Sequence, residues 1–559
     1  MSDAVNSVWA RARHLALKTG LSLAQGRHYR RLIEASQSPR EAQAALLERI
    51  LATNAETEFG KRHGISSIKD FADFRHAVPV QTYEDLRPLI ERQERTGDTC
   101  LTAEQPVYYH RTSGTVGEPK NIPVTASGLK RIRQQQKISA LAQSAGSDIF
   151  QGKILAITGQ AVEGKMAGGT PFGSASGLLH ESQSKLVKSR YVLPADIAGI
   201  EDYDSRYLAM AIHGLAEPAT TCIATANPST LVRLLSVINQ NADTIVDAIA
   251  TARMPESISR ITGLAGGLAA NHRRANALLD MIDRSGRLAY ADIWPNLKGI
   301  VTWTGGSCGV PLQALSGLLP KGCQIIELGY IASEVRGTIN VDARNNRCLP
   351  ALLDTYFEFV ERDAFESGGG DFLSLHELCD DQEYYVFVTT ADGLYRYDMN
   401  DIVRTTRRLN QTPTLAFVQK GKGVTNITGE KLHEAQVLTA VMSALSERGI
   451  DPAFFVMLAD QENAGYTLHL ESGSAGGDRD SDLSHEIEAR LRTSNIEYDG
   501  KRASGRLAPL EIRWLATGAG DRYRQFRVAE GQRDAQFKYL HLQYAHECAF
   551  DFNSVAAPG

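Results

Sequence analysis

Hydroxyl, glycine and lysine residues are concentrated in one short stretch, HRTSGTVGEPKNIPVT, which runs from residue 110 to residue 125. Glycine permits a tight turn whose backbone N–H groups surround an anion, and a lysine adds a positive charge. This chemistry suits the phosphates of a nucleotide, although the stretch matches neither the P-loop nor the dinucleotide-binding pattern. Taken alone, such a stretch is more often a plain polar loop. The candidate phosphate-binding residues are Thr112, Ser113, Gly114, Thr115 and Lys120.

Two further polar loops follow segments that we expect to be buried strands. Residues 299–304 and 323–328 are short apolar runs, as is 153–158. The first ends in TGGS (304–307) and the second in GYIASE (329–334). Ligand sites of α/β proteins lie at the ends of such strands, so we expect functional residues in both loops.

The composition of the 559-residue chain excludes several classes of protein. The formal net charge of -5 gives no sign of a nucleic-acid surface, and no run of about 18 apolar residues could cross a membrane. The seven cysteines are scattered and form no C-x-x-C pair, which argues against a disulfide framework or a zinc site. Basic residues interrupt the N-terminal segment where a signal peptide needs an apolar run. We therefore expect a soluble cytoplasmic protein.

The N-terminal 60 residues read as helical. Ser38 precedes a proline and is followed by Glu41, a pattern that predicts a helix start with a capping box. Leu46, Leu47, Ile50 and Leu51 then fall on one helical face.

The pattern of predicted strands and helices changes in the C-terminal part of the chain, which indicates a separate domain. Before it, strands are expected at 384–389, 394–397 and 402–406, with the turn Ala391-Asp392-Gly393 forming a hairpin. After the KGKG segment at 420–423 we expect strands at 454–458, 466–470 and 510–515 and a helix at 484–491. This order suits a small α+β domain, and we place the boundary at residue 421, with domains 1–421 and 422–559.

The stretch TSGTVGEPK resembles the phosphate loop of adenylate-forming enzymes. Its flanks contain, in order, NAETEFGKRHGI, DFRHAVPVQTYEDLRPLI, TANPSTL, WPNLKGIVTWTGGS, YFEFV and GLYRYDMND. Each motif is weak, but the ordered set resembles the Gretchen Hagen family, the auxin-responsive acyl-acid amido synthetases, from about residue 40 to residue 540. The resemblance implies an α/β (α+β) fold, with a large N-terminal domain of β-sheets and a β-barrel flanked by helices, and a small mobile C-terminal lid.

The resemblance also implies an activity. Members of this family use ATP and Mg²⁺ to convert a small carboxylic acid to an acyl-AMP, releasing pyrophosphate, and then pass the acyl group to the amine of an amino acid. Neither a nucleic acid nor a membrane is implied as a partner, and the oligomeric state is left open. Two segments that could line the acyl pocket are 170–183 and 227–231.

Individual roles are implied at the matching positions. Glu334 corresponds to the metal-binding and catalytic glutamate, Tyr330 to the residue against the adenine, and Asp401 to the acceptor of both ribose hydroxyls. Lys538 corresponds to the catalytic lysine of the mobile lid. The remaining nucleotide-binding positions are Gly305, Gly306, Ser307, Ser333 and, near the hinge, Lys420. Gly429 is expected to approach the second substrate.

The chain departs from the family pattern at several positions. Asn400 stands where glycine is usual before the aspartate, and asparagine tolerates left-handed backbone well. Asp398 replaces a commonly basic residue, Leu540 and His541 replace a proline and an arginine after Lys538, and the phosphate loop is one residue shorter than usual. These departures leave open a nucleotide-binding regulator without catalysis. A second alternative, an adenylating enzyme with a thiol or another amine as acceptor, stays open because nothing in the sequence identifies the acceptor.

Overall fold

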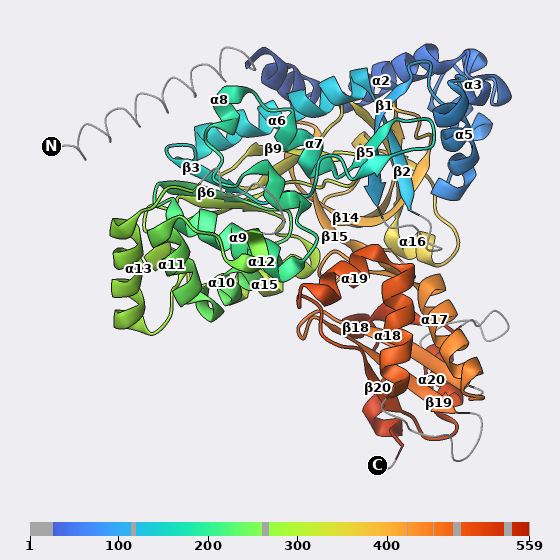
Figure 1. Cartoon of the computed structure of the whole chain (residues 1–559). Helices are drawn as coiled ribbons and strands as arrows, with labels where there is room; N and C mark the ends of the chain where they lie inside the picture. Colours follow the sequence, from blue (N-terminus) through green and yellow to red (C-terminus); the bar gives the residue numbers. More distant parts are fainter. Residues whose placement is uncertain are drawn as a thin grey trace. The chain divides into compact units, whose positions relative to one another are not determined.

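A computed structural model describes residues 26–112, 119–259, 268–421, 423–450, 452–472, 482–529 and 539–557 of the chain (Figure 1). These residues form two compact units, one ending at Val418 and the other beginning at Gln419. Four residues with a predicted role, Ser113, Gly114, Thr115 and Lys538, lie outside the described residues. None of the helices within these ranges is long and apolar enough to cross a membrane.

A parallel sheet forms the centre of one half of the first unit. Its strand order is β3-β6-β7-β8, and all three strands predicted for it from apolar runs are confirmed. The strands are β3 (Lys153–Ala156), β6 (Thr220–Ala224), β7 (Gly299–Thr302) and β8 (Gln324–Glu327). Because they run in parallel, the loops that follow them emerge at one edge of the sheet.

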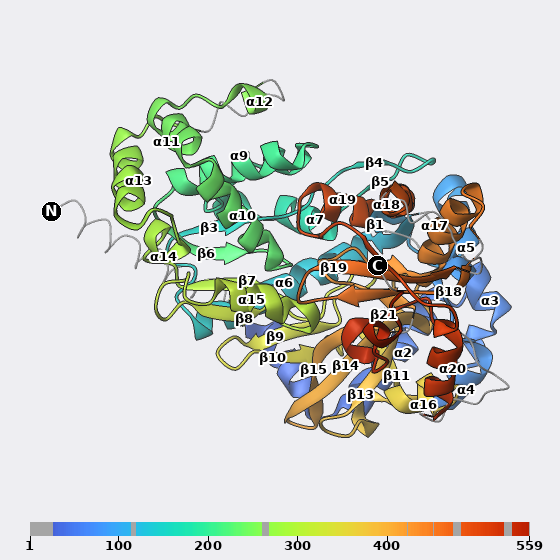
Figure 2. The ribbon, with the colours of Figure 1, turned by 90° about the horizontal axis from the view of Figure 1, so that it is seen from below.

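Amphipathic helices cover one face of this sheet. Leu155, Ile223 and Ile300 point from three strands into a core made with the apolar sides of those helices. Figure 2 shows the helices together beside β3 and β6. They are α9 (Tyr203–Ala216), α10 (Ser229–Gln240), α11 (Ala242–Thr251) and α13 (His272–Ser285). Burial of these apolar side chains keeps the strands in position, because it stabilises the folded state by about 25 cal/mol for each Å² of apolar surface removed from water.

The other half of the first unit contains mostly antiparallel strands, with β1 and β5 paired in parallel. One sheet has the order β12-β11-β13-β14-β15 and another the order β2-β1-β5-β4. The strands are β11 (Thr355–Glu361), β12 (Leu373–Ser374), β13 (Glu383–Thr390), β14 (Tyr397–Leu409), β15 (Thr412–Lys420), β1 (Pro106–Thr112), β2 (Lys120–Thr125), β4 (Gly164–Lys165) and β5 (Pro171–Gly173). A further pair comprises β9 (Thr338–Asp342) and β10 (Arg347–Pro350). Buried aromatic residues of β11, β13 and β14 pack with the N-terminal helices α2 (Pro39–Asn54) and α5 (Tyr83–Thr96).

The start of α2 differs from the prediction. The helix begins at Pro39 as expected, but the Ser38 side chain makes no capping hydrogen bond, so the predicted capping box is wrong. Ser38 has φ -135° and ψ 65°, and its carbonyl accepts the first helical bond from Ala42 N at 3.0 Å. The predicted apolar face is confirmed, since Leu46, Leu47, Ile50 and Leu51 are all buried.

The predicted hairpin is present with one change. β13 and β14 pair antiparallel, but residues 394–396 form no strand and β14 is continuous from Tyr397 to Leu409. The chain turns through two left-handed residues, Gly393 with φ 98° and Arg396 with φ 44°, before β14 begins. The left-handed backbone at these two positions turns the chain before β14 begins, and the sequence pattern of residues 394–397 does not reveal it.

The second unit is a four-stranded sheet with helices; the three strands and the helix predicted from its sequence are present, and the fourth strand, β21 (Leu542–Tyr544), was not predicted. The order is β20-β19-β18-β21, formed by β18 (Pro452–Asp460), β19 (Gly465–Ser472), β20 (Glu511–Trp514) and β21. Its helices include α17 (Glu434–Glu447), α18 (Asp482–Ser494), α19 (Ile496–Ala503) and α20 (Ala519–Ala529). The side chains of α17 and α18 that face the sheet share one apolar core with β18 and β19.

Candidate active site

One carboxylate joins the two loops that follow β7 and β8. Glu327, the last residue of β8, accepts hydrogen bonds from the backbone N and the hydroxyl of Thr304, the former at 2.7 Å, and from Gly329 N at 2.7 Å. This residue therefore fixes the positions of both TGGS and GYIASE. Sequence reasoning missed it, because a glutamate at the end of an apolar run has no motif of its own.

The two glycines of TGGS lie against the backbone of β15. A Cβ at Gly305 would overlap the carbonyl oxygen of Phe417, and one at Gly306 would lie 2.8 Å from the carbonyl of Val418. Gly306 also has φ 58°. Glycine is therefore required here for packing. Ser307 lies in the 3-10 helix Gly306–Cys308 ahead of α15 (Gly309–Leu315). Contact of these residues with a nucleotide stays a prediction.

Tyr330 and Asp401 meet although they are 71 residues apart. The Tyr330 hydroxyl donates a hydrogen bond of 2.7 Å to Oδ2 of Asp401. The Tyr330 ring stacks on Phe417 with 6.0 Å between centroids and 12° between planes, and it leaves no room for a Cβ at Gly337. The structure thus brings two of the predicted nucleotide-binding residues into direct contact.

The backbone before Asp401 is shaped by Asn400. Its φ of 46° lies in the left-handed region, as the substitution for glycine predicts, and its N–H donates to Asp398 Oδ1 at 2.7 Å. The start of β14 is anchored by Arg396, which donates to the fully buried Glu358 at 2.9 Å. Arg75 donates to the other oxygen of Glu358, also at 2.9 Å. These contacts hold Asp401 in place.

Ser333 and Glu334 lie beside His110. The ring Nδ1 of His110 is 2.9 Å from the carbonyl oxygen of Ser333, and since a carbonyl only accepts, Nδ1 carries the proton. Burial lowers the pKa of His110, while the Ser333 carbonyl and the charges of Asp392 and Glu334 act in the opposite direction. His110 is therefore neutral at physiological pH. It holds the Ser333–Glu334 segment against the strand that enters the phosphate loop.

Lys120 stands at the exit of the same loop. Thr112 and Lys120 are paired across β1 and β2, so the two ends of the loop are adjacent. Lys120 Nζ donates to the Tyr397 hydroxyl at 3.3 Å. The pKa of Tyr397 is raised well above its ordinary value by burial and then by the charge of Glu334. The Lys120 ammonium and the Glu334 carboxylate thus both act on the buried Tyr397 hydroxyl. Such a pair of opposite charges suits the binding of a polyanion together with its counter-ion.

Other predicted positions fall elsewhere. Lys420 ends β15 and belongs to the second unit. No group of three or more histidine, cysteine, aspartate or glutamate side chains within the described ranges could hold a metal ion by itself. The role of Glu334 as a Mg²⁺ ligand stays a prediction, and the site would be of the kind in which one or two carboxylates act together with substrate phosphates.

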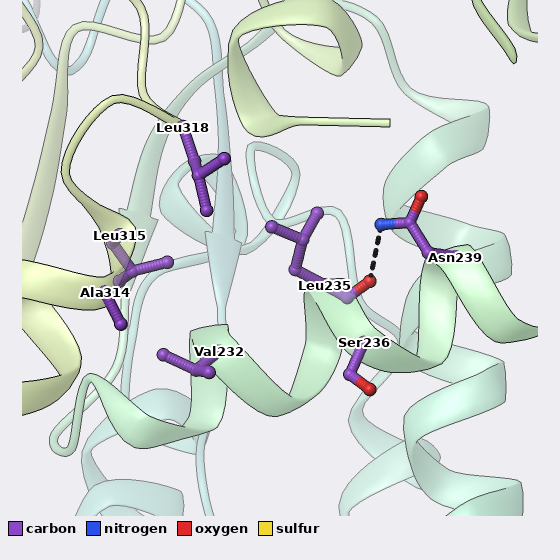
Figure 3. A pocket seen from close by; sticks show the side chains of 7 residues that line it. All are labelled: Val232, Leu235, Ser236, Asn239, Ala314, Leu315 and Leu318. Carbon is purple, nitrogen blue, oxygen red and sulfur yellow. Dashed lines mark hydrogen bonds between the residues drawn. The ribbon is translucent and has the colours of Figure 1, made fainter. Parts of the chain in front are cut away.

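A small apolar pocket lies between α10 and α15, away from this cluster. It encloses about 200 Å³, and Figure 3 shows its walls, together with the Asn239 amide that donates to Leu235 O at 2.9 Å. The lining residues are Val232, Leu235, Ser236, Asn239, Ala314, Leu315 and Leu318. None of them is titratable and none was predicted to act, so the pocket has no chemistry of its own.

Three family models match the chain in order. The GH3 family N-terminal domain matches residues 28–322, the central domain residues 349–420 and the C-terminal domain residues 435–546.

Curated proteins are similar to most of the chain, and solved structures share its fold. The chain is 26% identical to indole-3-acetic acid-amido synthetase GH3.4 of Arabidopsis thaliana, covering 90% of this chain and 89% of the relative. It is 27% identical to GH3.15 of the same plant over 89% of each chain. The structure of the GH3.15 acyl acid amido synthetase superposes with a TM-score of 0.62 at 23% identity, covering 94% of this chain and 95% of the other. A 2-hydroxyisobutyryl-CoA ligase shares the fold with a TM-score of 0.50 at 15% identity, covering 85% and 86%.

Proposed function

The chain belongs to the GH3 family, and on that premise we propose that it is an acyl-acid amido synthetase. It adenylates a small carboxylic acid with ATP and Mg²⁺ and transfers the acyl group to the amine of an amino acid in the cytoplasm. Residues 1–421 carry adenylation, and residues 422–559 act as the lid. The named relatives are indole-3-acetic acid-amido synthetases, which makes aryl acetic acids the first class of acid to test.

The observation that carries the proposal is the convergence of Tyr330, Asp401, Glu334 and Lys120 in one unit. They come from the loop after β8, from β14 and from β2. Tyr330 contacts Asp401 directly, and the charge of Glu334 acts on Tyr330 and on the Tyr397 hydroxyl that Lys120 contacts. A structural ion-pair network alone does not require a tyrosine, a lysine and two carboxylates from such distant segments.

The residues present fit ATP and Mg²⁺. Asp401 offers carboxylate oxygens of the kind that accept from two adjacent ribose hydroxyls. Glu334 offers the hard oxygen ligand that Mg²⁺ prefers, and when bound the ion neutralises charge on the phosphates and aligns them.

In adenylation, an anionic carboxylate attacks the α-phosphorus of another anion, so the barrier falls when charge is neutralised and the two groups are aligned. Lys120 supplies positive charge at the exit of the phosphate loop. Asp401, held by Tyr330, fixes the ribose, and His110 fixes the backbone that carries Glu334. Lys538 supplies the second positive charge, by resemblance. In transfer, the amine attacks the acyl carbon and AMP leaves.

Exchange of labelled pyrophosphate into ATP, measured over a panel of aryl and alkyl acids, tests adenylation. We expect exchange with at least one acid and its loss in Glu334→Gln, whereas Glu361→Gln, an exposed glutamate at the end of β11, keeps it. ATP binding without exchange for any acid would refute the ligase proposal and favour a regulator. Mass detection of the products formed with mixed amino acids and with coenzyme A identifies the acceptor. A thioester without an amide would replace the amide-forming assignment.

A further inference from the structure

Residues 331–336 form a tight hairpin that has Glu334 at its tip. The first and last of these residues pair antiparallel. Ala332 N donates to Val335 O at 2.8 Å, so only Ser333 and Glu334 lie between the two arms. The position of the Glu334 carboxylate therefore depends on what holds the arms of the hairpin in place.

Arg336 fastens the returning arm of this hairpin to helix α6 (Ala126–Gly146). Its Nη1 donates to Gln136 Oε1 at 2.8 Å, and its Nη2 donates to Ser139 Oγ at 2.9 Å. The two acceptors are three residues apart and therefore lie on one face of the helix. Because the guanidinium is planar and rigid, the two bonds fix both the distance and the rotation of the arm relative to α6.

Stability alone does not account for an arginine at this position. Arg336 is buried, and the two side chains that accept from its guanidinium are neutral. Its buried Nε has no hydrogen-bond partner within the described part of the chain. Burial of a cation without a carboxylate partner costs free energy, and so does a buried N–H that is left unpaired. The geometry that the two bonds to α6 impose is the feature that an apolar side chain of similar length would not supply.

Resting on the proposed function, in which Glu334 is the Mg²⁺ ligand, we propose that Arg336 is a positioning residue for that ligand. Mg²⁺ requires close to ideal octahedral geometry, so a small displacement of a ligand oxygen weakens its binding. His110 holds the tip of the hairpin through the Ser333 carbonyl, and Arg336 holds the arm that returns from the tip. With both anchors in place, the Glu334 carboxylate is oriented before the metal and the nucleotide bind. Arg336 acts through Glu334 and needs no contact of its own with either.

Metal binding without turnover separates this role from a structural one. The probe is Mn²⁺, which takes the same oxygen ligands as Mg²⁺, in complex with α,β-methylene ATP, which cannot release pyrophosphate. Titration of this complex with enzyme, followed by the relaxation rate of water protons, gives its dissociation constant. Calorimetry in EDTA gives the affinity for the same nucleotide without metal.

Two variants remove the anchor from opposite sides. Arg336→Met removes the guanidinium, and Gln136→Met removes one of its acceptors while Arg336 stays in place. Arg274→Met is the matched control. That buried guanidinium also donates to two neutral acceptors, the carbonyls of Leu215 and Ile293, but it anchors α13 instead of the hairpin.

We expect Arg336→Met to weaken binding of the Mn²⁺–nucleotide complex by about 10-fold or more, as when the partner that orients a metal ligand is removed. Gln136→Met should give a smaller loss, and the double variant should lose no more than Arg336→Met, because both changes remove one contact. Affinity for the metal-free nucleotide should stay unchanged in each. Arg274→Met should lower the unfolding temperature and keep the parent's affinity for the Mn²⁺–nucleotide complex.

Unchanged affinity for the Mn²⁺–nucleotide complex in Arg336→Met would overturn the positioning role. An equal loss of metal-free nucleotide affinity would overturn it too, as would the same loss of metal binding in Arg274→Met. Parent-like binding of the complex by Glu334→Gln would instead refute the metal assignment within the proposed function, so the two failures are distinguishable. Should Arg336→Met fail to fold, Gln136→Met gives the same comparison at a half-buried position.

Discussion

The Tyr330 hydroxyl donates a 2.7 Å hydrogen bond to Asp401, and the two side chains are only 6% and 1% exposed. Burial, followed by the charge of Asp401, raises the pKa of Tyr330 well above its ordinary value. The phenol therefore remains protonated and acts as a donor over the whole physiological range. The loop after β8 and strand β14 are joined through this contact, and the predicted ribose-binding carboxylate depends on it for its orientation.

Removal of this donor should weaken nucleotide binding. Tyr330→Phe leaves a buried carboxylate with one donor fewer, which costs about 1–3 kcal/mol. Because Asp401 then loses its fixed orientation, we expect ATP affinity, measured by calorimetry, to fall as well. Tyr395→Phe is the matched control, since that buried phenol donates to the Leu101 carbonyl at 2.8 Å and lies outside the cluster. Equal ATP affinities in the two variants would contradict a positioning role for Tyr330.

Glu327 should control the two site loops without contacting a substrate. In Glu327→Gln the amide group replaces one of the oxygens that accept from Thr304 and Gly329, so at least one N–H loses its partner. Loss of a charge-assisted hydrogen bond costs about 1.5–3 kcal/mol. We expect a lower kcat for pyrophosphate exchange together with a lower unfolding free energy, measured in urea. Unchanged kcat in a destabilised variant would limit Glu327 to a role in folding.

The glycines of the TGGS loop allow a sharper test of packing. A Cβ at Gly305 would overlap the Phe417 carbonyl, whereas nothing lies within 4 Å of a Cβ at Gly309. Gly305→Ala should therefore destabilise the first unit by about 1–3 kcal/mol, the usual range for overpacking. Gly309→Ala, four residues further on, should be neutral or stabilising because it starts α15. Thermal unfolding of the two variants measures this difference. Equal unfolding temperatures for the two variants would show that β15 shifts to accommodate the added methyl group without loss of stability.

The sequence predicts regular elements well where one physical signal dominates. The apolar run 299–304 corresponds to β7, which is buried on both faces and needs only apolar side chains. The run 323–328 corresponds to β8, an edge strand in which Ile326 is buried. The capping box at Ser38 and the strand at 394–397 were wrong, because backbone angles set by tertiary contacts decided both. In the site, motif order pointed to Tyr330 and Asp401. The role of Glu327 depends on contacts between distant segments, and no local pattern contains it.

Asn400 stands directly before Asp401, at a position where the family usually has glycine, and substitutions there test how Asp401 depends on the backbone. Its φ of 46° suits glycine and asparagine and strains other side chains. Asn400→Gly should change the unfolding free energy by no more than about 0.5 kcal/mol. Asn400→Val should cost about 1–2 kcal/mol, because a β-branched residue is disfavoured in left-handed backbone, and should raise the KM for ATP by displacing Asp401. A stable Asn400→Val variant with a normal KM would contradict this dependence.

Acid should destabilise each unit through one buried histidine. Burial lowers the pKa of His213, in the first unit, and of His469, in the second, to about 4, and the positive charge of Arg513 contributes at His469. Both unfolded side chains titrate near the ordinary value of 6.5, so the unfolded chain binds the additional protons and stability falls as pH drops from about 6.5 towards 4. Between about pH 7 and pH 5 the loss is roughly 2 kcal/mol for each histidine. His213→Leu should remove this loss from the first unit alone and His469→Leu from the second, measured by hydrogen exchange resolved by segment. His272→Leu, at an exposed helix start, is the control, and an unchanged pH dependence in both core variants would assign the acid sensitivity to other groups.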